Sequence, residues 1–237
     1  MVIEGVVTDQ AGPDSVLVSK TGDYFTPALT FPQVSNAFVT IFDDRGNGDT
    51  LKEASSGLYY SSALQGVPGR TYTLKVTAEG KEYDALSTMP YKVMIDSLYA
   101  TPLREFDGDR GFTVYVAFKD PPEQGNYYRI KPHVNSLPPD SIGGGRYLLY
   151  SDKLTNGNEA VYQIRLGRNV NAGDTVTVEL LSLDKATYDY FNTLKDVLSS
   201  DRSPTSLSPA NPTTNLSNGS LGYFAAFAID SKRIILK

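Results

Sequence analysis

The 237-residue chain contains no cysteine, no tryptophan and a single histidine. The absence of cysteine excludes disulfides, thiolate catalysis and cysteine-ligated zinc. No apolar run approaches the length of about 18 residues that a membrane-spanning helix needs. The net charge of −5 comes without a basic block, which argues against a nucleic-acid partner.

Aromatic and turn-forming residues are abundant instead. The chain has 16 Tyr, 10 Phe, 20 Gly and 14 Pro, and its hydrophobic fraction of 40% is enough to form a core. Aromatic side chains fit pleated sheets, whereas Gly and Pro favour turns. The composition therefore predicts an all-β fold with many turns.

The first part of the chain, residues 1–90, is predicted to form one small domain. Short β runs alternate with turn signals, as in residues 71–77, where Tyr72, Leu74 and Val76 share one face. About seven such runs at this spacing are typical of an immunoglobulin-like or transthyretin-like β-sandwich. Met89 and Pro90 then interrupt the pattern, and we place the domain boundary there.

Residues 91–237 continue the β pattern with longer loops, and predict a larger antiparallel β-sandwich or partly open barrel. One helix is expected near 184–199, with Asp184 as its N-cap. The last two strands are expected at 222–229 and 233–236, joined by a turn at residues 230–231. The fold class predicted overall is all-β, with two antiparallel domains.

No group of residues carries a strong catalytic or metal-binding signature. His133 lies outside any triad-like motif and is interpreted as a surface residue. The acidic turn at residues 43–49 is typical of a hairpin and lacks the ligand spacing of a calcium loop. Paired carboxylates occur in 104–111, within a single loop, and nothing in the sequence marks two that would face each other across a cleft. We therefore predict a non-enzymatic protein without a metal or cofactor.

Tyrosine and arginine are common at binding surfaces, and loops on a rigid sheet often carry function. On this basis five residues are candidates for ligand contacts: Tyr127, Arg129, Tyr147, Tyr223 and Phe224.

Motifs along nearly the whole chain resemble one known family. They lie at residues 3–9, 34–39, 57–59, 69–76, 80–83, 118–122, 126–129, 151–153, 156–157, 188–191 and 211–224. The last of these, running from Asn211 to Phe224, is the most specific. In this order the motifs resemble the DUF4249 family of Bacteroidetes outer-membrane lipoproteins, whose function is not established.

The resemblance implies where such a protein works. It implies an export signal and a lipidated cysteine upstream of Met1, and hence an outer-membrane location through a lipid anchor. It also implies a TonB-dependent transporter as partner, with a role in binding a nutrient or macromolecular ligand. A structural or adhesive surface protein, of fimbrial or matrix type, is the alternative. The family supplies no catalytic residues.

Overall fold

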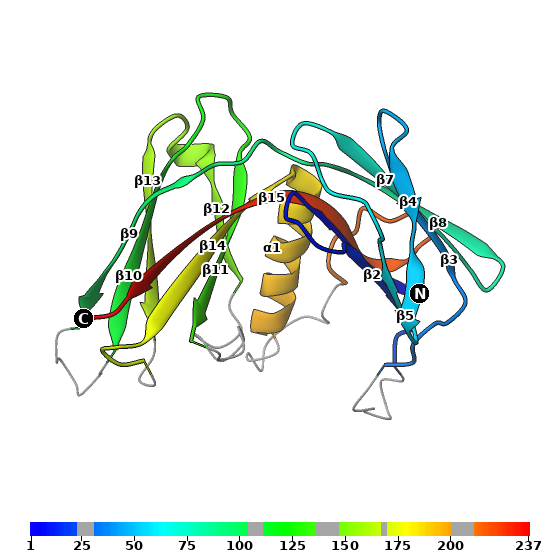
Figure 1. Cartoon of the computed structure of the whole chain (residues 1–237), viewed down its shortest axis with the longest axis horizontal. Coiled ribbons are helices and arrows are strands. Elements are labelled where there is room, and N and C mark those ends of the chain that lie inside the picture. The colour runs from blue at the N-terminus through cyan, green and yellow to red at the C-terminus, as the bar shows by residue number, and fades with distance from the viewer. Residues whose placement is uncertain (23–30, 104–110, 136–146, 167–169, 201–210) are drawn as a thin grey trace. The chain divides into compact units, whose positions relative to one another are not determined.

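The computed structural model describes residues 1–22, 31–103, 111–135, 147–166, 170–200 and 211–237 (Figure 1). The chain divides into two compact units, which are described separately below. Unit 1 comprises Met1–Tyr91 and Leu183–Ala228, and unit 2 comprises Lys92–Ser182 and Ile229–Lys237. This differs from the expected division after residue 90, because the segment after residue 182 returns to unit 1. Strand pairing between segments far apart in sequence causes that return.

Unit 1 is a β-sandwich of two sheets. One sheet has the order β15-β1-β2-β6-β5, and the other has the order β4-β3-β7-β8. The strands are β1 (Val2–Thr8), β2 (Ser15–Ser19), β3 (Phe38–Asp43), β4 (Gly48–Thr50), β5 (Lys52–Ser55), β6 (Leu58–Tyr60), β7 (Thr71–Ala78), β8 (Lys81–Thr88) and the first part of β15 (Leu221–Ile235).

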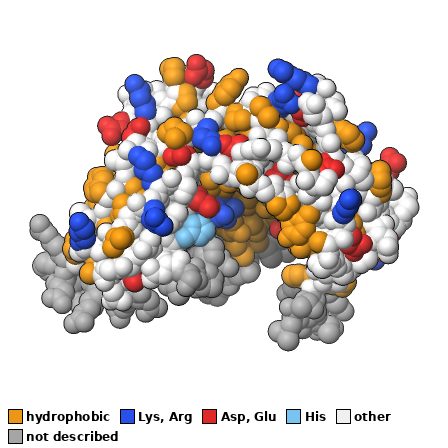
Figure 2. Space-filling view, viewed as in Figure 1, with side chains coloured by type: hydrophobic (Ala, Val, Ile, Leu, Met, Phe, Trp, Pro, Cys, Tyr) orange, Lys and Arg blue, Asp and Glu red, His pale blue; other side chains and the backbone are white. Residues whose placement is uncertain are grey.

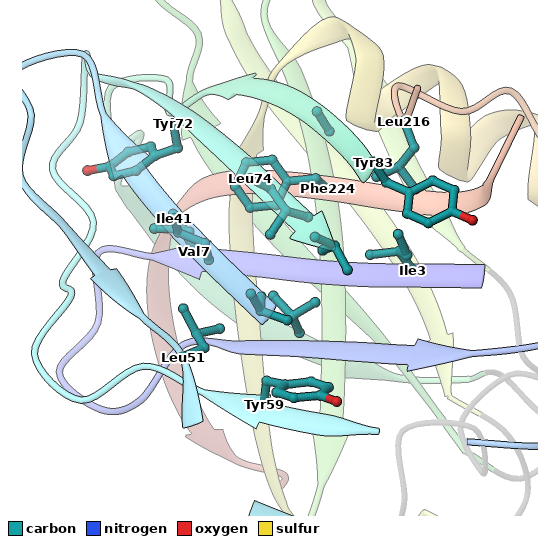
Figure 3. Close-up of a cluster of buried hydrophobic side chains, with 14 of the residues drawn as sticks. Ile3, Val7, Ile41, Leu51, Tyr59, Tyr72, Leu74, Tyr83, Leu216 and Phe224 are labelled. Carbon is teal, nitrogen blue, oxygen red and sulfur yellow. The ribbon is translucent and has the colours of Figure 1, made fainter. Parts of the chain in front are cut away.

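The two sheets of unit 1 share one core, which Figure 3 shows in close-up. Alternating residues of each strand fill it, as the sequence pattern predicts for half-buried strands. On β7, Tyr72, Leu74 and Val76 are each at most 1% exposed. The hairpin from β7 to β8 turns on Glu79 and Gly80, whose φ angles of 51° and 74° suit a two-residue turn.

Unit 2 is also a sandwich of two sheets around its own core. One sheet has the order β13-β10-β9, and the other continues as β12-β11-β14-β15. The strands are β9 (Ile95–Pro102), β10 (Phe112–Lys119), β11 (Tyr127–Val134), β12 (Leu148–Ser151), β13 (Glu159–Leu166), β14 (Thr175–Leu183) and the last part of β15, with a 3-10 turn η2 (Asp152–Leu154).

Strand β15 contributes to both units, and here the prediction of two strands joined by a turn is wrong. The strand is continuous through residues 230–231. Asp230 lies within the strand, and its Oδ2 accepts a hydrogen bond from the Ile95 backbone N–H at 2.8 Å. Lys232 likewise donates to the Asp96 carbonyl oxygen at 2.7 Å. Both polar side chains therefore tie β15 to the start of β9.

The pairing of β15 also departs from the predicted antiparallel arrangement. In unit 1 it runs parallel to β1, with Val2 opposite Leu221 and Thr8 opposite Phe227. The first and last segments of unit 1 are thus hydrogen-bonded neighbours.

The single predicted helix is confirmed as α1 (Lys185–Ser200). Asp184 caps it, since its Oδ1 accepts the Thr187 N–H at 2.8 Å. Its Oδ2 accepts a hydrogen bond from the Ser87 hydroxyl at 2.6 Å, which fixes the start of the helix to β8. Among the described residues, no helix is both long and apolar enough to cross a membrane.

The all-β prediction with one helix is confirmed. The strand orders of the described residues show open sheets and no closed barrel, which is consistent with the predicted all-β sandwich.

Candidate functional site

Three of the family-like motifs meet in unit 2 at Asp120, which is 1% exposed; they lie at residues 118–122, 126–129 and 156–157. Its Oδ1 accepts a hydrogen bond from the Tyr128 hydroxyl at 2.5 Å, and its Oδ2 accepts the Gly157 N–H at 3.1 Å. Burial, reinforced by the hydrogen bond to Asp120, raises the pKa of Tyr128 well above its usual range. The phenol therefore stays protonated and acts as a donor.

Asp152, in the motif at residues 151–153, makes a second contact with the loop that leads into β11. Its Oδ2 accepts the N–H groups of Gly125 at 2.7 Å and Asn126 at 2.9 Å. The Asn156 amide also donates to the Pro122 carbonyl oxygen at 2.9 Å. We call Asp120, Asp152 and the loop residues that they bind the loop clasp. The two carboxylates accept hydrogen bonds that hold these loops in place. The motifs therefore have a structural role.

The most specific motif, residues 211–224, is a latch on strand β8 of unit 1. The Asn215 amide donates to the carbonyl oxygens of Leu86 at 3.0 Å and Phe224 at 2.8 Å, and its Oδ1 accepts the Phe224 N–H at 3.0 Å. The Ser217 hydroxyl donates to Asp84 Oδ1 at 2.8 Å. A further strand beside β8 would supply backbone hydrogen-bond partners. Here short polar side chains supply these hydrogen bonds instead.

The acidic turn between β3 and β4 is held by its own hydrogen bonds. Asp43 Oδ1 accepts the N–H groups of Arg45 at 3.0 Å and Asn47 at 2.8 Å, and Arg70 forms an ion pair with Asp43 Oδ2. Burial opposes ionisation of Asp43, but hydrogen bonds from Asn47 and Arg70 outweigh it and lower the pKa to about 2. Within the described part of the chain, no three His, Cys, Asp or Glu side chains are grouped as metal ligands.

The single histidine lies in a charged row on the outer side of β11 and β14. His133 Nε2 and Lys131 Nζ each lie 3.3 Å from Glu179 Oε2. Figure 2 shows this histidine, in pale blue, beside acidic and basic side chains. Lys131 and Glu179 form an ion pair that bridges two neighbouring strands, and the His133 ring lies beside it.

Three of the five predicted contact residues come from the β11–β12 region of unit 2. Tyr127 and Arg129 lie on one face of β11, since side chains alternate along a strand. The Arg129 guanidinium carbon lies 4.6 Å from the centre of the Tyr147 ring, which is cation–π geometry. All three side chains are partly exposed. We call them the Tyr–Arg site.

The other two candidates lie in unit 1. Tyr223 packs against the helix, with its ring centre 4.7 Å from that of Tyr190 and 5.0 Å from that of Phe191. Phe224 is 0% exposed and points into the core in Figure 3. Gly5 makes room for it, because a Cβ added there would lie 3.0 Å from its ring. A side chain so buried cannot contact a ligand, so Phe224 leaves the candidate set.

Sequence reasoning did not single out one aromatic pair on the surface of unit 2. Tyr99 and Tyr115 stack with ring centres 4.8 Å apart and planes 8° apart. The available signal was the alternation in β10, which places Tyr115 on the face opposite the buried Val114 and Val116. The carboxylates considered in 104–110 lie outside the described residues.

Comparison with known proteins gives one family match. A search of curated proteins finds no match. The model of the family described as "Domain of unknown function (DUF4249)" matches residues 1–233, which is nearly the entire chain. The chain therefore belongs to the DUF4249 family.

Proposed function

We propose that the protein is a non-enzymatic, lipid-anchored binding protein of the outer membrane, the ligand-binding or accessory component of a TonB-dependent uptake system. The observation that carries the binding role is the Tyr–Arg site. A guanidinium held over a phenol ring presents charge, hydrogen-bond donors and an apolar surface within one small area. Tyr and Arg are the side chains that dominate binding energy at such surfaces.

The Tyr–Arg site stands on a rigid support. Tyr128, between Tyr127 and Arg129 in sequence, is 1% exposed and is anchored by its hydrogen bond to Asp120. Because neighbouring residues of a strand point to opposite faces, anchoring Tyr128 inside directs Tyr127 and Arg129 outward. Binding side chains on a fixed strand lose less conformational freedom when a ligand arrives.

The non-enzymatic role is supported by how three of the four buried carboxylates in the described part of the chain are used. Asp43, Asp120 and Asp152 each accept hydrogen bonds from the backbone or from a neighbouring side chain. These interactions stabilise loops, so the carboxylate oxygens act as hydrogen-bond acceptors within the fold.

Co-purification tests the proposed partner. The full-length lipidated protein would be isolated from native outer membranes and its companions identified by mass spectrometry. A TonB-dependent transporter recovered at equal stoichiometry supports the proposal and names the transporter whose substrate should be assayed. Recovery of the protein alone would contradict it.

Paired variants then test the Tyr–Arg site. Tyr127→Ala with Arg129→Ala should weaken binding to the recovered transporter or its substrate at least about tenfold, as expected for two hot-spot side chains. The matched control is Tyr60→Ala with Lys52→Ala, an exposed cross-strand pair in unit 1. Equal affinity of the Tyr127/Arg129 variant and the control would remove the site assignment.

A structural or adhesive role remains the second candidate, and one observation favours it. Strand β5 ends its sheet, and all four of its residues are exposed. An open edge of this kind can accept a strand from another subunit. Size-exclusion chromatography over a wide concentration range tests this role, because subunit exchange predicts larger species as concentration rises, whereas a constant monomer contradicts it.

A further inference from the structure

Several strands of the described residues lie at the end of a sheet, and each of them has one side without a neighbouring strand. They are β4, β5, β8, β9, β12 and β13. Such an edge offers its backbone groups to another chain, so most folds cover or shorten it. Strands β4, β5 and β12 have only three or four residues each.

Among the long edge strands, β8 and β9 are covered by side chains of the same molecule. On β8, Ser217 and Asn215 of the latch bind backbone groups. On β9, Asp230 and Lys232 bind backbone groups of the first two residues. Strand β13 has eight residues, all in register with β10, and in the described ranges no hydrogen bond reaches its far edge, the side away from β10. This long edge is therefore uncovered.

One backbone hydrogen bond shows which groups of β13 point to the far edge. The Asp120 N–H donates to the Asn158 carbonyl oxygen at 3.1 Å, and these two residues continue the β10–β13 register by one pair. Bonded and non-bonded pairs alternate along antiparallel strands, so the even-numbered residues of β13 bond to β10. The N–H and C=O groups of the odd-numbered residues therefore point to the far edge: Glu159, Val161, Gln163 and Arg165.

The side chains of the same four residues are all exposed. Val161 is 49% exposed, although it is apolar and lies in the middle of the strand. The end positions carry opposite charges, Glu159 and Arg165, which are separated from Tyr162 by three residues in each direction. The far edge of β13 therefore has a charge pattern that reverses about Tyr162.

This pattern makes β13 complementary to a second copy of itself. A two-fold axis at Tyr162 places Glu159 opposite the partner's Arg165 and Val161 opposite the partner's Gln163, and repeats both contacts on the other side of the axis. All the outward-facing residues then form bonded pairs with one another. A shift by one residue would send the side chains to opposite faces, and a shift by two would remove both Glu–Arg pairs.

The neighbouring strand also favours this register. Lys119 of β10 lies opposite Glu159, and Thr113 lies opposite Arg165. Across the axis, the Glu159 carboxylate would therefore lie between Lys119 and the partner's Arg165, and its two oxygens can accept hydrogen bonds from both. Opposite charges directly across an antiparallel pair stabilise it, and like charges destabilise it.

We propose that the protein forms a symmetric homodimer in which the β13 strands of two copies pair antiparallel, centred on Tyr162. The β9-β10-β13 sheets of the two copies become one continuous sheet. A two-fold contact closes on itself, so the assembly stops at the dimer. The proposal does not depend on the transporter partnership, and it differs from subunit exchange at β5 because it uses unit 2 alone.

Sedimentation velocity of the whole chain tests for the dimer. Between about 1 and 500 µM, the protein should pass from monomer to dimer with a dissociation constant below about 100 µM and no larger species. Sedimentation as a monomer up to about 500 µM would overturn the proposal.

A charge exchange tests the Glu–Arg pairs. Glu159→Arg alone places arginine opposite arginine, and Arg165→Glu alone places glutamate opposite glutamate. Each variant should self-associate at least about tenfold more weakly than the wild type, because two attractive pairs become repulsive. An equimolar mixture restores opposite charges at both pairs and should form a heterodimer with nearly wild-type affinity. Lys52→Glu, at the exposed edge strand β5, is the control and should dimerise as the wild type does.

Disulfide trapping tests the register, because the chain has no cysteine of its own. Residues in a bonded antiparallel pair have Cα atoms about 5.5 Å apart, which suits a disulfide. A mixture of Val161→Cys and Gln163→Cys proteins should therefore form a covalent heterodimer faster than either protein alone forms a homodimer. Lys75→Cys mixed with Thr77→Cys, at the same spacing on the central strand β7, is the control.

Two further results would overturn the proposal. One is a mixture of the charge variants that associates no more tightly than either variant alone. The other is a dimer that persists unchanged in both charge variants, which would place the contact on another surface. Recovery of the dimer by mixing also shows that the variants are folded. None of these results bears on the co-purification of a transporter, so the two proposals can fail separately.

Discussion

Asp14 tests how burial of a carboxyl group affects the stability of this fold. The residue is 4% exposed, at the end of the turn that joins β1 and β2. Its Oδ1 accepts the Thr8 N–H at 2.9 Å, whereas its buried Oδ2 has no hydrogen-bond partner among the described residues. Burial outweighs the hydrogen bonds from Thr8 and raises the pKa of Asp14 from 3.8 to about 7.

The raised pKa makes folding stability depend on pH in a defined direction. Below pH 3.8 both the folded and the unfolded chain hold the Asp14 proton, so the contribution is constant. Between that pH and about 7 only the folded chain holds it, so stability falls by about 1.4 kcal/mol per pH unit. Over the whole interval, about 4 kcal/mol of stability is lost as the pH rises.

Asp14→Asn should remove this dependence, because the amide does not titrate. The Asn oxygen can still accept the Thr8 N–H, but its buried NH₂ group lacks an acceptor, which costs about 1–3 kcal/mol. At pH 8.5 the variant should therefore be more stable than the wild type by about 2 kcal/mol. At pH 4.5 it should be the less stable of the two.

Urea denaturation at pH 4.5, 6.0 and 8.5 measures this difference, followed by circular dichroism since the chain has no tryptophan. Comparing variant with wild type at each pH cancels the other titrating groups. Asp44→Asn, an exposed change in the β3–β4 turn, is the control. A difference between Asp14→Asn and wild type that stays constant across the three pH values would refute the reasoning.

Two further substitutions test the latch and the β1–β15 pair. Asn215→Ala removes three hydrogen bonds to Leu86 and Phe224 and should lower the free energy of unfolding by about 2–3 kcal/mol. Amide hydrogen exchange should become faster in β8. Unchanged protection of the β8 amides would count against the latch. Gly222→Ala should destabilise by about 3 kcal/mol or more, because φ is +98° and the new Cβ would lie 2.0 Å from the Ile3 carbonyl oxygen. Thermal denaturation measures this change, and a melting temperature equal to that of the wild type would contradict it.

Local sequence patterns predicted the local structure well. The β runs at residues 2–8 and 159–166 predict strands with the bounds that β1 and β13 have, and the turn signal at Glu79–Gly80 predicts the hairpin that joins β7 to β8. Asp184 caps the single helix. These features depend on neighbouring residues alone, so side-chain alternation, capping and turn chemistry are sufficient to find them.

Long-range pairing could not be predicted in this way. The parallel contact of β1 with β15 joins segments more than two hundred residues apart, and alternation says nothing about which strand lies beside which. The short polar strand β5 has no apolar face to reveal it. The return of residues 183–228 to unit 1 follows from such pairings.

The candidate site shows the same division. Arg129 and Tyr147 were both among the five candidates, but the contact between them needed the structure. Naming both Tyr223 and Phe224 overlooked the two-residue period of a strand, which sends adjacent side chains to opposite faces. The structure assigns Phe224 to the core.

The parallel pairing of β1 with β15 also has a mechanical consequence. Seven aligned positions, from Val2 with Leu221 to Thr8 with Phe227, join the two strands. A force that pulls on Met1 and on the chain beyond Phe227 in opposite directions acts along both strands, so it loads their ladder in shear. The hydrogen bonds then share the tension and must rupture together, whereas a hairpin pulled from its open end unzips one bond at a time. Unit 1 is therefore built to withstand tension applied between the chain start and the strand that leaves it.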